Sequence, residues 1–502
     1  MRSEDTRRWL ALGALALAML TIGLDVTVLT VALPTLAVDL HANTAALQWF
    51  TGAYTLALAA LMLPAGALGD RYGRKKVLLG ALVLFGAASV ACAFAGSAGQ
   101  LIAGRVVLGV AAAAMMPLSM AVLPVLFTDP GQRQRALTIW VTSTAIGLPL
   151  GPIVGGWLLQ HYWWGSVFLI NVPLVVIGAL AVATLVPESH GDNGFRIDLT
   201  GAVLSAVGML GLTYGFIRIG EQGWDEPLAW LCVGAGVALL AAFLAWQRRV
   251  AHPLIDVGLF RAPGFRWGTA FSILVNFAMF GMFFTVPQYF QAVLGVDALG
   301  SGLRLLPMIG GVVLGSRLVD VLLPRVGVRA VLVGGFLILA VGLGLGALTT
   351  VDTGYGPTAL WITVLGTGMG LVMPAAMGLA MGELDANRAG AGSALLQALR
   401  QAGGTIGVAV LGTVLATRYR AELGPLDRAP IADGVNAGVA ATQGDPAQLT
   451  HVRHAFVAGM DTMLGVCAAL CVAAALVAVF VIRRGTSAPV IAEDAAESIH
   501  AR

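Results

Sequence analysis

A long apolar segment recurs from one end of this 502-residue chain to the other. Each copy runs for roughly 20 residues, the length of helix that crosses the hydrocarbon core of a bilayer. Backbone polar groups inside a bilayer must pair within their own segment, so each copy is expected to form a helix. We expect fourteen such spans, near residues 9–34, 46–68, 77–96, 100–127, 134–159, 165–187, 199–218, 228–247, 266–292, 302–323, 328–349, 357–382, 390–417 and 455–482.

The composition argues against a soluble protein and against several kinds of partner. Only 11% of the residues are charged, whereas soluble domains carry roughly a quarter. The net charge of +3 gives no reason to expect a nucleic acid. The 65 glycines suit a membrane bundle, in which small residues let helices pack closely. The four cysteines lie in apolar runs without further ligand residues at metal spacing, so we expect core residues and no metal.

Basic residues are distributed unevenly between alternate loops. If the N-terminus is cytoplasmic, the inside loops hold the basic clusters at 71–76, 248–249, 325–329 and 483–484, and the outside segments hold few basic residues. The positive-inside rule then places both termini in the cytoplasm, which an odd number of spans would not allow. The only lysines stand at 75 and 76 among many Arg and Ala residues, which favours a GC-rich bacterial gene and hence a bacterial inner membrane.

Two polar connectors, at 188–198 and 248–266, divide the spans into groups of six, two and six. We predict an N-terminal six-helix bundle at 1–187, two additional spans with connectors at 188–262, a C-terminal six-helix bundle at 263–482 and a cytoplasmic tail at 483–502. The polar stretch 420–453 is expected to be a long outside loop of the C-terminal bundle. A degraded repeat relates the two bundles, because 70–78 after span two resembles 325–332 after span ten. Two related halves around a central site are typical of a secondary transporter.

Five short motifs occur in the first half of the chain. They are Leu24-Asp25-Val26-Thr27-Val28 with Ala32-Leu33-Pro34, Gly66-Ala67-Leu68-Gly69-Asp70-Arg71-Tyr72-Gly73-Arg74, Arg105 with Gly109, Gly147-Leu148-Pro149-Leu150-Gly151-Pro152 with Gly155-Gly156, and Phe168-Leu169-Ile170-Asn171-Val172-Pro173. In this combination the chain resembles the major facilitator superfamily, specifically its fourteen-helix drug:proton antiporter branch of the EmrB/QacA type. That branch usually has an Arg-Trp pair just before the last motif, where this chain has Trp164-Gly165, so details of that outer loop stay open.

The resemblance implies an all-α membrane fold, with two six-helix bundles and two extra central transmembrane helices. It also implies a monomer in the lipid bilayer that needs no cofactor and is not an enzyme. A phosphate-binding loop of the Gly-x-x-x-x-Gly-Lys-Ser/Thr type is not found, nor is a soluble segment long enough for an ATPase. A proton gradient is therefore the expected energy source.

Proton coupling requires an ionisable side chain inside the membrane. Asp25 fits best, because it lies about 24 Å along the first helix at a rise of about 1.5 Å per residue. Burial favours its neutral form and an approaching cation favours its ionised form, so a proton and a cationic substrate would compete. The alternative is a paired, inert structural Asp. Arg105 in span four is the expected counter-charge, or else it binds backbone carbonyls at a helix crossing. Asp461 in span fourteen is a second proton-site candidate.

Two further motifs are given roles by the resemblance. Gly66, Asp70, Arg71, Gly73 and Arg74 would form the inside gate, with Asp70 at the N-terminus of span thirteen, where the helix dipole favours an anion. The alternative is a solvated turn. Gly147, Gly151, Pro152, Gly155 and Gly156 form the antiporter motif, and their expected role is a tight seam between span five and a neighbour. The alternative is ordinary small-residue packing.

Aromatic and polar residues of other spans are candidate substrate contacts. Aromatic faces bind flat lipophilic cations by stacking and cation–π contact, although many such residues in membrane proteins face lipid or core. The candidates are Trp49, Tyr54, Asn276, Phe280, Phe284, Gln397 and Arg400.

The leading hypothesis is a proton-coupled antiporter that exports lipophilic, often cationic, drugs or antibiotics by alternating access. A dedicated exporter of one endogenous metabolite or self-made antibiotic is the alternative. A membrane enzyme or scaffold is disfavoured, because the histidines lie mostly in loops without paired ligands.

Overall fold

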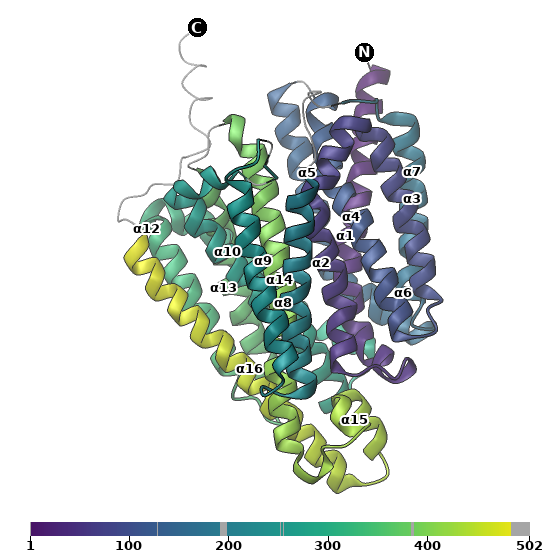
Figure 1. Cartoon of the computed structure of the whole chain (residues 1–502), viewed down its shortest axis with the longest axis vertical. Coiled ribbons are helices and arrows are strands. Elements are labelled where there is room, and N and C mark those ends of the chain that lie inside the picture. Colours follow the sequence, from purple (N-terminus) through teal and green to yellow (C-terminus); the bar gives the residue numbers. More distant parts are fainter. Residues whose placement is uncertain are drawn as a thin grey trace.

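The computed structural model describes residues 2–127, 129–190, 198–251, 253–254, 256–382 and 386–482, and this described part is helical without strands (Figure 1). The first group of helices is α1 (Arg2–Asp39), α2 (Thr44–Tyr72), α3 (Arg74–Ala93), α4 (Ala98–Leu126), α5 (Pro130–His161), α6 (Ser166–Leu169) and α7 (Asn171–Leu185). Two long helices follow, α8 (Leu199–Gln222) and α9 (Pro227–Gln247). The last group is η1 (Val257–Arg261), α10 (Pro263–Gln288), η2 (Tyr289–Val293), α11 (Ala298–Arg304), α12 (Leu306–Gly346), α13 (Tyr355–Gly382), α14 (Ala386–Leu423), η3 (Gly424–Leu426), η4 (Ile431–Asp433), α15 (Val435–Thr442) and α16 (Pro446–Val481).

Each of the fourteen predicted spans coincides with helix. In the described part of the chain, 13 segments are long and apolar enough to cross a membrane. The predicted fifth span is covered by α5, a helix of 32 residues that is not one of those 13. The prediction of an all-α, multi-pass membrane protein is therefore confirmed.

The helices begin where the sequence supplies a capping side chain. Asn43, Ser97, Asp198 and Asp445 each accept a hydrogen bond from a backbone N–H in the first turn of the next helix. Such caps satisfy donors that have no partner inside the helix. Gly73 ends α2 with φ of +107°, a conformation that a side chain disfavours, and α3 begins at the next residue.

Element boundaries differ from the sequence-based expectation in two places. Spans ten and eleven join in one long helix, α12, which is broken at Gly327, where φ is +79°. The stretch 420–453 is not a plain loop, because α14 continues to Leu423 and α16 already begins at Pro446. Asp445 caps α16 and Pro446 occupies its first turn, where the missing N–H of proline costs nothing.

The hydrophobic core falls into two main clusters. One is built mainly from residues of α1–α7, and the other lies within α10–α16. Phe284, Ala398 and Val408 belong to the first cluster although they lie on α10 and α14, so they mark where the two groups meet. The helices α8 and α9 pack on each other, and α8 also contacts α2 and α14.

The two ends of the molecule differ in how the groups meet. We call the end with the N-terminus the terminal side and the end with α15 the loop side; they lie at the top and bottom of Figure 1. On the loop side, Gln48 Nε2 of α2 donates to the Val408 and Ala409 carbonyls of α14, and Thr405 Oγ1 donates to Thr55 Oγ1 at 2.6 Å. Nearer the terminal side, the same two helices and α8 border an apolar cavity of about 240 Å³. The described contacts therefore close the loop side.

Candidate functional site

A buried ion pair lies between α1 and α4. Arg105 Nη1 donates to Asp25 Oδ2 at 2.6 Å, and the two side chains are 1% and 0% exposed. Leaving either charge unpaired in so buried a place would cost several kcal/mol, roughly 3–5. The sequence-based expectation that Arg105 is the counter-charge of Asp25 therefore agrees with the geometry.

Further polar groups complete the surroundings of this pair. Asn171 Nδ2 donates to Asp25 Oδ1 at 2.9 Å and reaches Ser89 Oγ at 3.4 Å. Arg105 Nε donates to the Phe50 carbonyl at 2.9 Å. Arg105 therefore has both a carboxylate and a backbone carbonyl as partners, and its role in tuning the proton affinity of Asp25 stays a prediction. Because both carboxylate oxygens of Asp25 accept a bond, its charge is well compensated.

Two of these residues were not assigned a role from the sequence. Asn171 begins α7 directly after the one-turn helix α6, which turns its amide toward α1. Its presence in the Phe168–Pro173 motif was the available signal. Ser89 stands in an apolar run of α3, and the sequence holds no signal that would have selected it.

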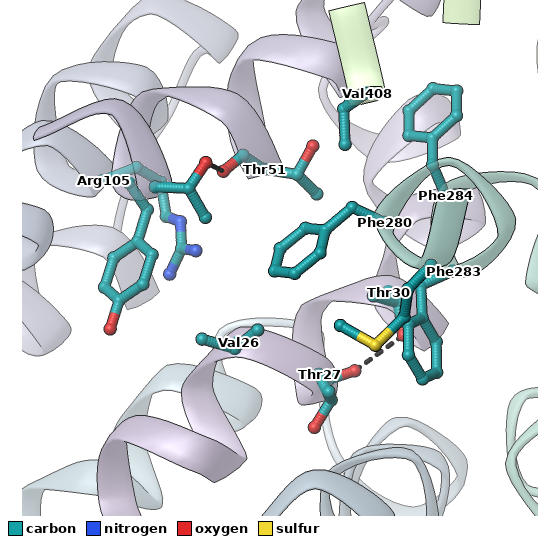
Figure 2. A pocket seen from close by; sticks show the side chains of 12 residues that line it. Val26, Thr27, Thr30, Thr51, Arg105, Phe280, Phe283, Phe284 and Val408 are labelled. Carbon is teal, nitrogen blue, oxygen red and sulfur yellow. Dashed lines mark hydrogen bonds between the residues drawn. The ribbon is translucent and has the colours of Figure 1, made fainter. Parts of the chain in front are cut away.

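A small cavity of about 20 Å³, which has room for a group the size of one water, lies between the two groups of helices, with Arg105 on one wall (Figure 2). Tyr54 forms part of the same wall, and its ring lies 4.4 Å from the Arg105 guanidinium carbon. On the opposite side Phe280, Phe283 and Phe284 of α10 enter, and Figure 2 shows the Phe280 ring directed toward Arg105. The lining consists of Val26, Thr27, Thr30, Thr51, Tyr54, Thr55, Arg105, Met279, Phe280, Phe283, Phe284 and Val408. Asp25 is outside this lining, behind Arg105.

Four threonines of the lining were also missed from the sequence. Thr27 and Thr30 on α1, and Thr51 and Thr55 on α2, donate their hydroxyl hydrogens to carbonyls of their own helix. Their donors are thus used locally, and the remaining lone pairs are acceptors. Threonine in a membrane helix commonly does this, so nothing in the sequence distinguishes these four from other threonines.

The other substrate candidates separate into two places. Tyr54, Phe280 and Phe284 line the cavity, whereas Trp49 packs against residues of α8. The remaining three gather on α10 and α14. Asn276 Nδ2 donates to the Arg400 carbonyl at 2.7 Å, and Arg400 Nη1 donates to Gln397 Oε1 at 2.6 Å.

The glycines of the antiporter motif lie where α5 touches other helices. A Cβ on Gly147 would lie 2.8 Å from the Leu20 carbonyl oxygen of α1, and one on Gly155 would lie 2.7 Å from Val28 Cγ2. Gly151 of α5 faces Thr27 of α1. Gly156 instead faces α11, because its Cβ would lie 2.5 Å from Leu299 Cα.

Pro152 of the same motif also meets α11, since its carbonyl lies against Gly302. The absence of side chains on both helices permits this close approach. A role of this seam in preventing ion leak remains a prediction.

The gate motif surrounds the turn between α2 and α3. Lys75 N donates to Glu188 Oε1 at 3.0 Å, and Arg74 Nη1 donates to the Ala121 carbonyl at 3.1 Å. Glu188, which follows α7, was not predicted. Glycine is favoured here because φ is +107°, a conformation that other residues rarely adopt, and the Glu188 carboxylate lies beside it.

Gly66 and Arg71 of the gate motif make other contacts. Gly66 faces Pro117 of α4, and the Arg71 guanidinium lies 5.3 Å from the Tyr72 ring. The side chain of Asp70 and those of the residues around Gly390 are not described, so the predicted contact between them stays a prediction.

Asp461 lies on α16 and is half-buried. Its Oδ1 is buried without a hydrogen-bond partner among the described residues. It does not line the central cavity. Within the described part of the chain, His, Cys, Asp and Glu do not gather in a group of three or more that would hold a metal ion.

The chain was compared with known proteins and structures. The family model of the Major Facilitator Superfamily matches residues 15–408. The chain is 32% identical to the tetracenomycin C resistance and export protein of Streptomyces glaucescens, over 94% of this chain and 91% of the relative. It is 33% identical to the multidrug efflux pump LfrA of Mycolicibacterium smegmatis, over 95% of this chain and 97% of the relative. It is 36% identical to the cephamycin export protein CmcT of Amycolatopsis lactamdurans, over 78% of this chain and 81% of the relative.

Solved structures show the same fold. A bacterial homologue of the human lysosomal transporter Spinster superposes with a TM-score of 0.67 at 17% identity, covering 95% of this chain and 97% of the other. The nucleoside transporter NupG superposes with a TM-score of 0.61 at 12% identity, covering 94% and 100%. The helical architecture, the matched residues and the full-length relatives agree, and the chain belongs to the Major Facilitator Superfamily of membrane transporters.

Proposed function

We propose that this chain is a proton-coupled antiporter that exports lipophilic, often cationic, drugs or antibiotics by alternating access. It works as a monomer in the bacterial inner membrane, with both termini in the cytoplasm, and needs no cofactor besides the proton gradient. Relatives at 32–33% identity that are named as a multidrug efflux pump and as a resistance and export protein support the substrate class.

The observation that carries this proposal is the buried Asp25–Arg105 pair beside the central cavity. The cavity holds only about 20 Å³ in this state, so a substrate enters after the two groups of helices have moved apart. While Asp25 is ionised, the pair is neutral and a cation can then bind beside it without repulsion. A proton on Asp25 removes that compensation and leaves the Arg105 charge at the cavity wall. Because two positive charges in a low-dielectric space repel strongly, the proton and a cationic substrate exclude each other, which is antiport.

Alternating access requires that one side of the cavity be closed at a time. The α2–α14 contacts and the α5–α11 seam close the loop side. With the termini in the cytoplasm, this is the inward-facing state. We propose that the bundles 1–187 and 263–482 rock against each other, and that the segment 188–262 adds two spans beside them.

A dedicated exporter of one endogenous metabolite or self-made antibiotic is the second candidate. The observation that favours it is the 36% identity to a protein named as a cephamycin export protein. Resistance tests separate the two candidates: a broad exporter protects cells against several unrelated compounds, and a dedicated exporter protects against one.

The first experiment measures ethidium efflux from energised cells, with and without a protonophore. We compare the wild type with Asp25→Asn, and with Asp352→Asn as a matched control, because Asp352 lies exposed in the loop after α12. Efflux that stops with the protonophore and in Asp25→Asn, but continues in the control, supports the proposal.

Efflux that persists in Asp25→Asn at the wild-type rate and still depends on the gradient would remove Asp25 from the coupling mechanism. Wild-type efflux that ignores the protonophore would contradict proton coupling itself. The absence of ethidium efflux by expressed wild type would favour the dedicated exporter.

A further inference from the structure

Arg400 is a cationic side chain in the middle of α14, inside the predicted thirteenth span. It is half-buried, and its Nε is buried without a hydrogen-bond partner among the described residues. A charged side chain at such a position is expensive to keep unless it has a partner or a function. Its surroundings therefore need an explanation.

The hydrogen bonds of Arg400 use one edge of its guanidinium group. Nη1 donates to Gln397 Oε1 at 2.6 Å and contacts Met377 Sδ at 3.7 Å. Gln397 is one turn away on the same helix, and a thioether is a weak acceptor. These bonds fix the orientation of the group but do not neutralise its charge. The opposite edge, formed by Nε and Nη2, has no partner in the described part of the chain.

The contrast with Arg105 shows what Arg400 lacks. Arg105 is neutralised by Asp25 at 2.6 Å, whereas a carboxylate does not reach Arg400 among the described residues. Arg105 and Asp25 together contribute no net charge to the centre of the molecule. The uncompensated charge contributed by these three residues is therefore positive and belongs to Arg400.

Arg400 does not itself line the central cavity, but a residue one turn away contacts a ring that does. A Cβ on Gly404, one turn along α14, would lie 3.0 Å from the Phe280 ring and 3.3 Å from Asn276 Nδ2. One turn of helix is about 5.4 Å. Phe280 is the ring that Figure 2 shows directed toward Arg105. The Phe280 ring therefore packs against α14 one turn from the Arg400 position.

We propose that Arg400 is a binding subsite for a carboxylate group of the exported substrate, with the substrate's ring system against Phe280. The Nε–Nη2 edge presents two parallel N–H donors, a geometry that matches the two oxygens of a carboxylate. Gln397 positions the guanidinium by holding Nη1. This inference rests on the proposed export function and adds to its substrates the lipophilic aromatic compounds that carry a carboxylate, zwitterions included.

The test uses two dyes that differ at one group. Rhodamine 110 carries a free carboxylate, and rhodamine 123 is its methyl ester with the same ring system. Binding of each dye to the purified full-length protein in neutral detergent is measured by fluorescence anisotropy, without a gradient. Arg400→Gln is expected to weaken rhodamine 110 binding by about tenfold to a hundredfold, the loss of hydrogen bonds to a charged group. Binding of rhodamine 123 is expected to change little.

Two further variants sharpen the test. Arg400→Lys keeps the charge and loses the two-donor edge, so rhodamine 110 binding should fall between that of the wild type and Arg400→Gln. Arg218→Gln is the matched control, because Arg218 on α8 pairs with Glu226 at 2.9 Å and does not line the central cavity. The affinity of Arg218→Gln for each dye should match that of the wild type. Arg400→Gln is expected to fold, because none of the described residues pairs a charge with Arg400 that the substitution would strand.

The subsite is overturned if Arg400→Gln weakens both dyes equally, if it weakens neither, or if the wild type binds rhodamine 110 no better than rhodamine 123. These outcomes concern binding without a gradient, so they differ from a failure of the export proposal. The export proposal would fail in a different way: the wild type would bind the dyes, but energised cells that express it would export neither dye.

Discussion

Removing one member of the Asp25–Arg105 pair should cost more stability than removing both. The pair is 0% and 1% exposed, and its two charges are joined at 2.6 Å. Asp25→Leu leaves the Arg105 charge with only the Phe50 carbonyl and the Tyr54 ring. Arg105→Met leaves the Asp25 charge with only the Asn171 amide. Each variant therefore strands one buried charge.

The size of the effect follows from the burial. Stranding a buried charge costs about 3–5 kcal/mol, whereas replacing both members with apolar residues of similar volume is often neutral or stabilising by about 1–4 kcal/mol. We expect each single variant to lose about 3–5 kcal/mol of unfolding free energy and the double variant to recover most of it. Proton-dependent export should be lost in all three variants, since the proposed proton site is gone.

The assay is a double-mutant cycle on unfolding free energies, measured by denaturant titration in mixed micelles. Cys92, Cys467 and Cys471 are buried free thiols, so their reaction with a fluorescent maleimide reports unfolding. The cycle isolates the interaction between the two residues from the separate effect of each substitution.

The reasoning would be refuted by additive effects, in which the double variant is as unstable as the two single losses combined. Single losses below about 1 kcal/mol would refute it as well, because that is the size expected of exposed pairs. A double variant that regains stability and also keeps proton-driven export would leave the electrostatic account intact but contradict the proposed coupling role.

Two glycine substitutions test the contacts around the site. Gly156→Ala places a methyl carbon 2.5 Å from Leu299 Cα, so it should open the loop-side seam. The measurement is faster maleimide labelling of a cysteine introduced into the cavity lining, and unchanged labelling would show that the seam does not depend on Gly156. Gly73→Ala places a side chain at φ of +107° and 2.8 Å from Glu188, which should cost about 1–3 kcal/mol of strain and lower the melting temperature; an unchanged melting temperature would speak against a strained turn. Gly80→Ala is the control for both, because its Cβ would meet nothing within 4 Å.

Much of the fold was predictable because membrane helices are specified locally. A span must satisfy its own backbone and present apolar side chains to lipid, so its position appears as a run of apolar residues. All fourteen predicted spans coincide with helix for this reason. The helical ends of 420–453 were missed, because apolar length does not report a cap such as Asp445.

The membership of the site was predicted in part. Asp25 and Arg105 stood out because charges inside apolar runs are rare, and the structure brings them to 2.6 Å. Asn171 and Ser89 carry no charge, so only their position between α7, α3 and α1 reveals them. Glu188 is one of several loop carboxylates in the sequence, and the fold alone selects it for the α3 N-terminus.

The sequence by itself thus determined that the chain crosses the membrane many times, which charged residues stand inside apolar spans and which motifs it carries. Each of these follows from the cost of placing a polar group or an open backbone in hydrocarbon, which acts on every segment separately. Only the tertiary structure decided that Asp25 is paired, that no carboxylate of the described residues reaches Arg400, and that Phe280 packs against α14 at Gly404. These facts depend on distances between helices far apart in the chain, set by the packing of whole helix faces, and a single sequence does not record them.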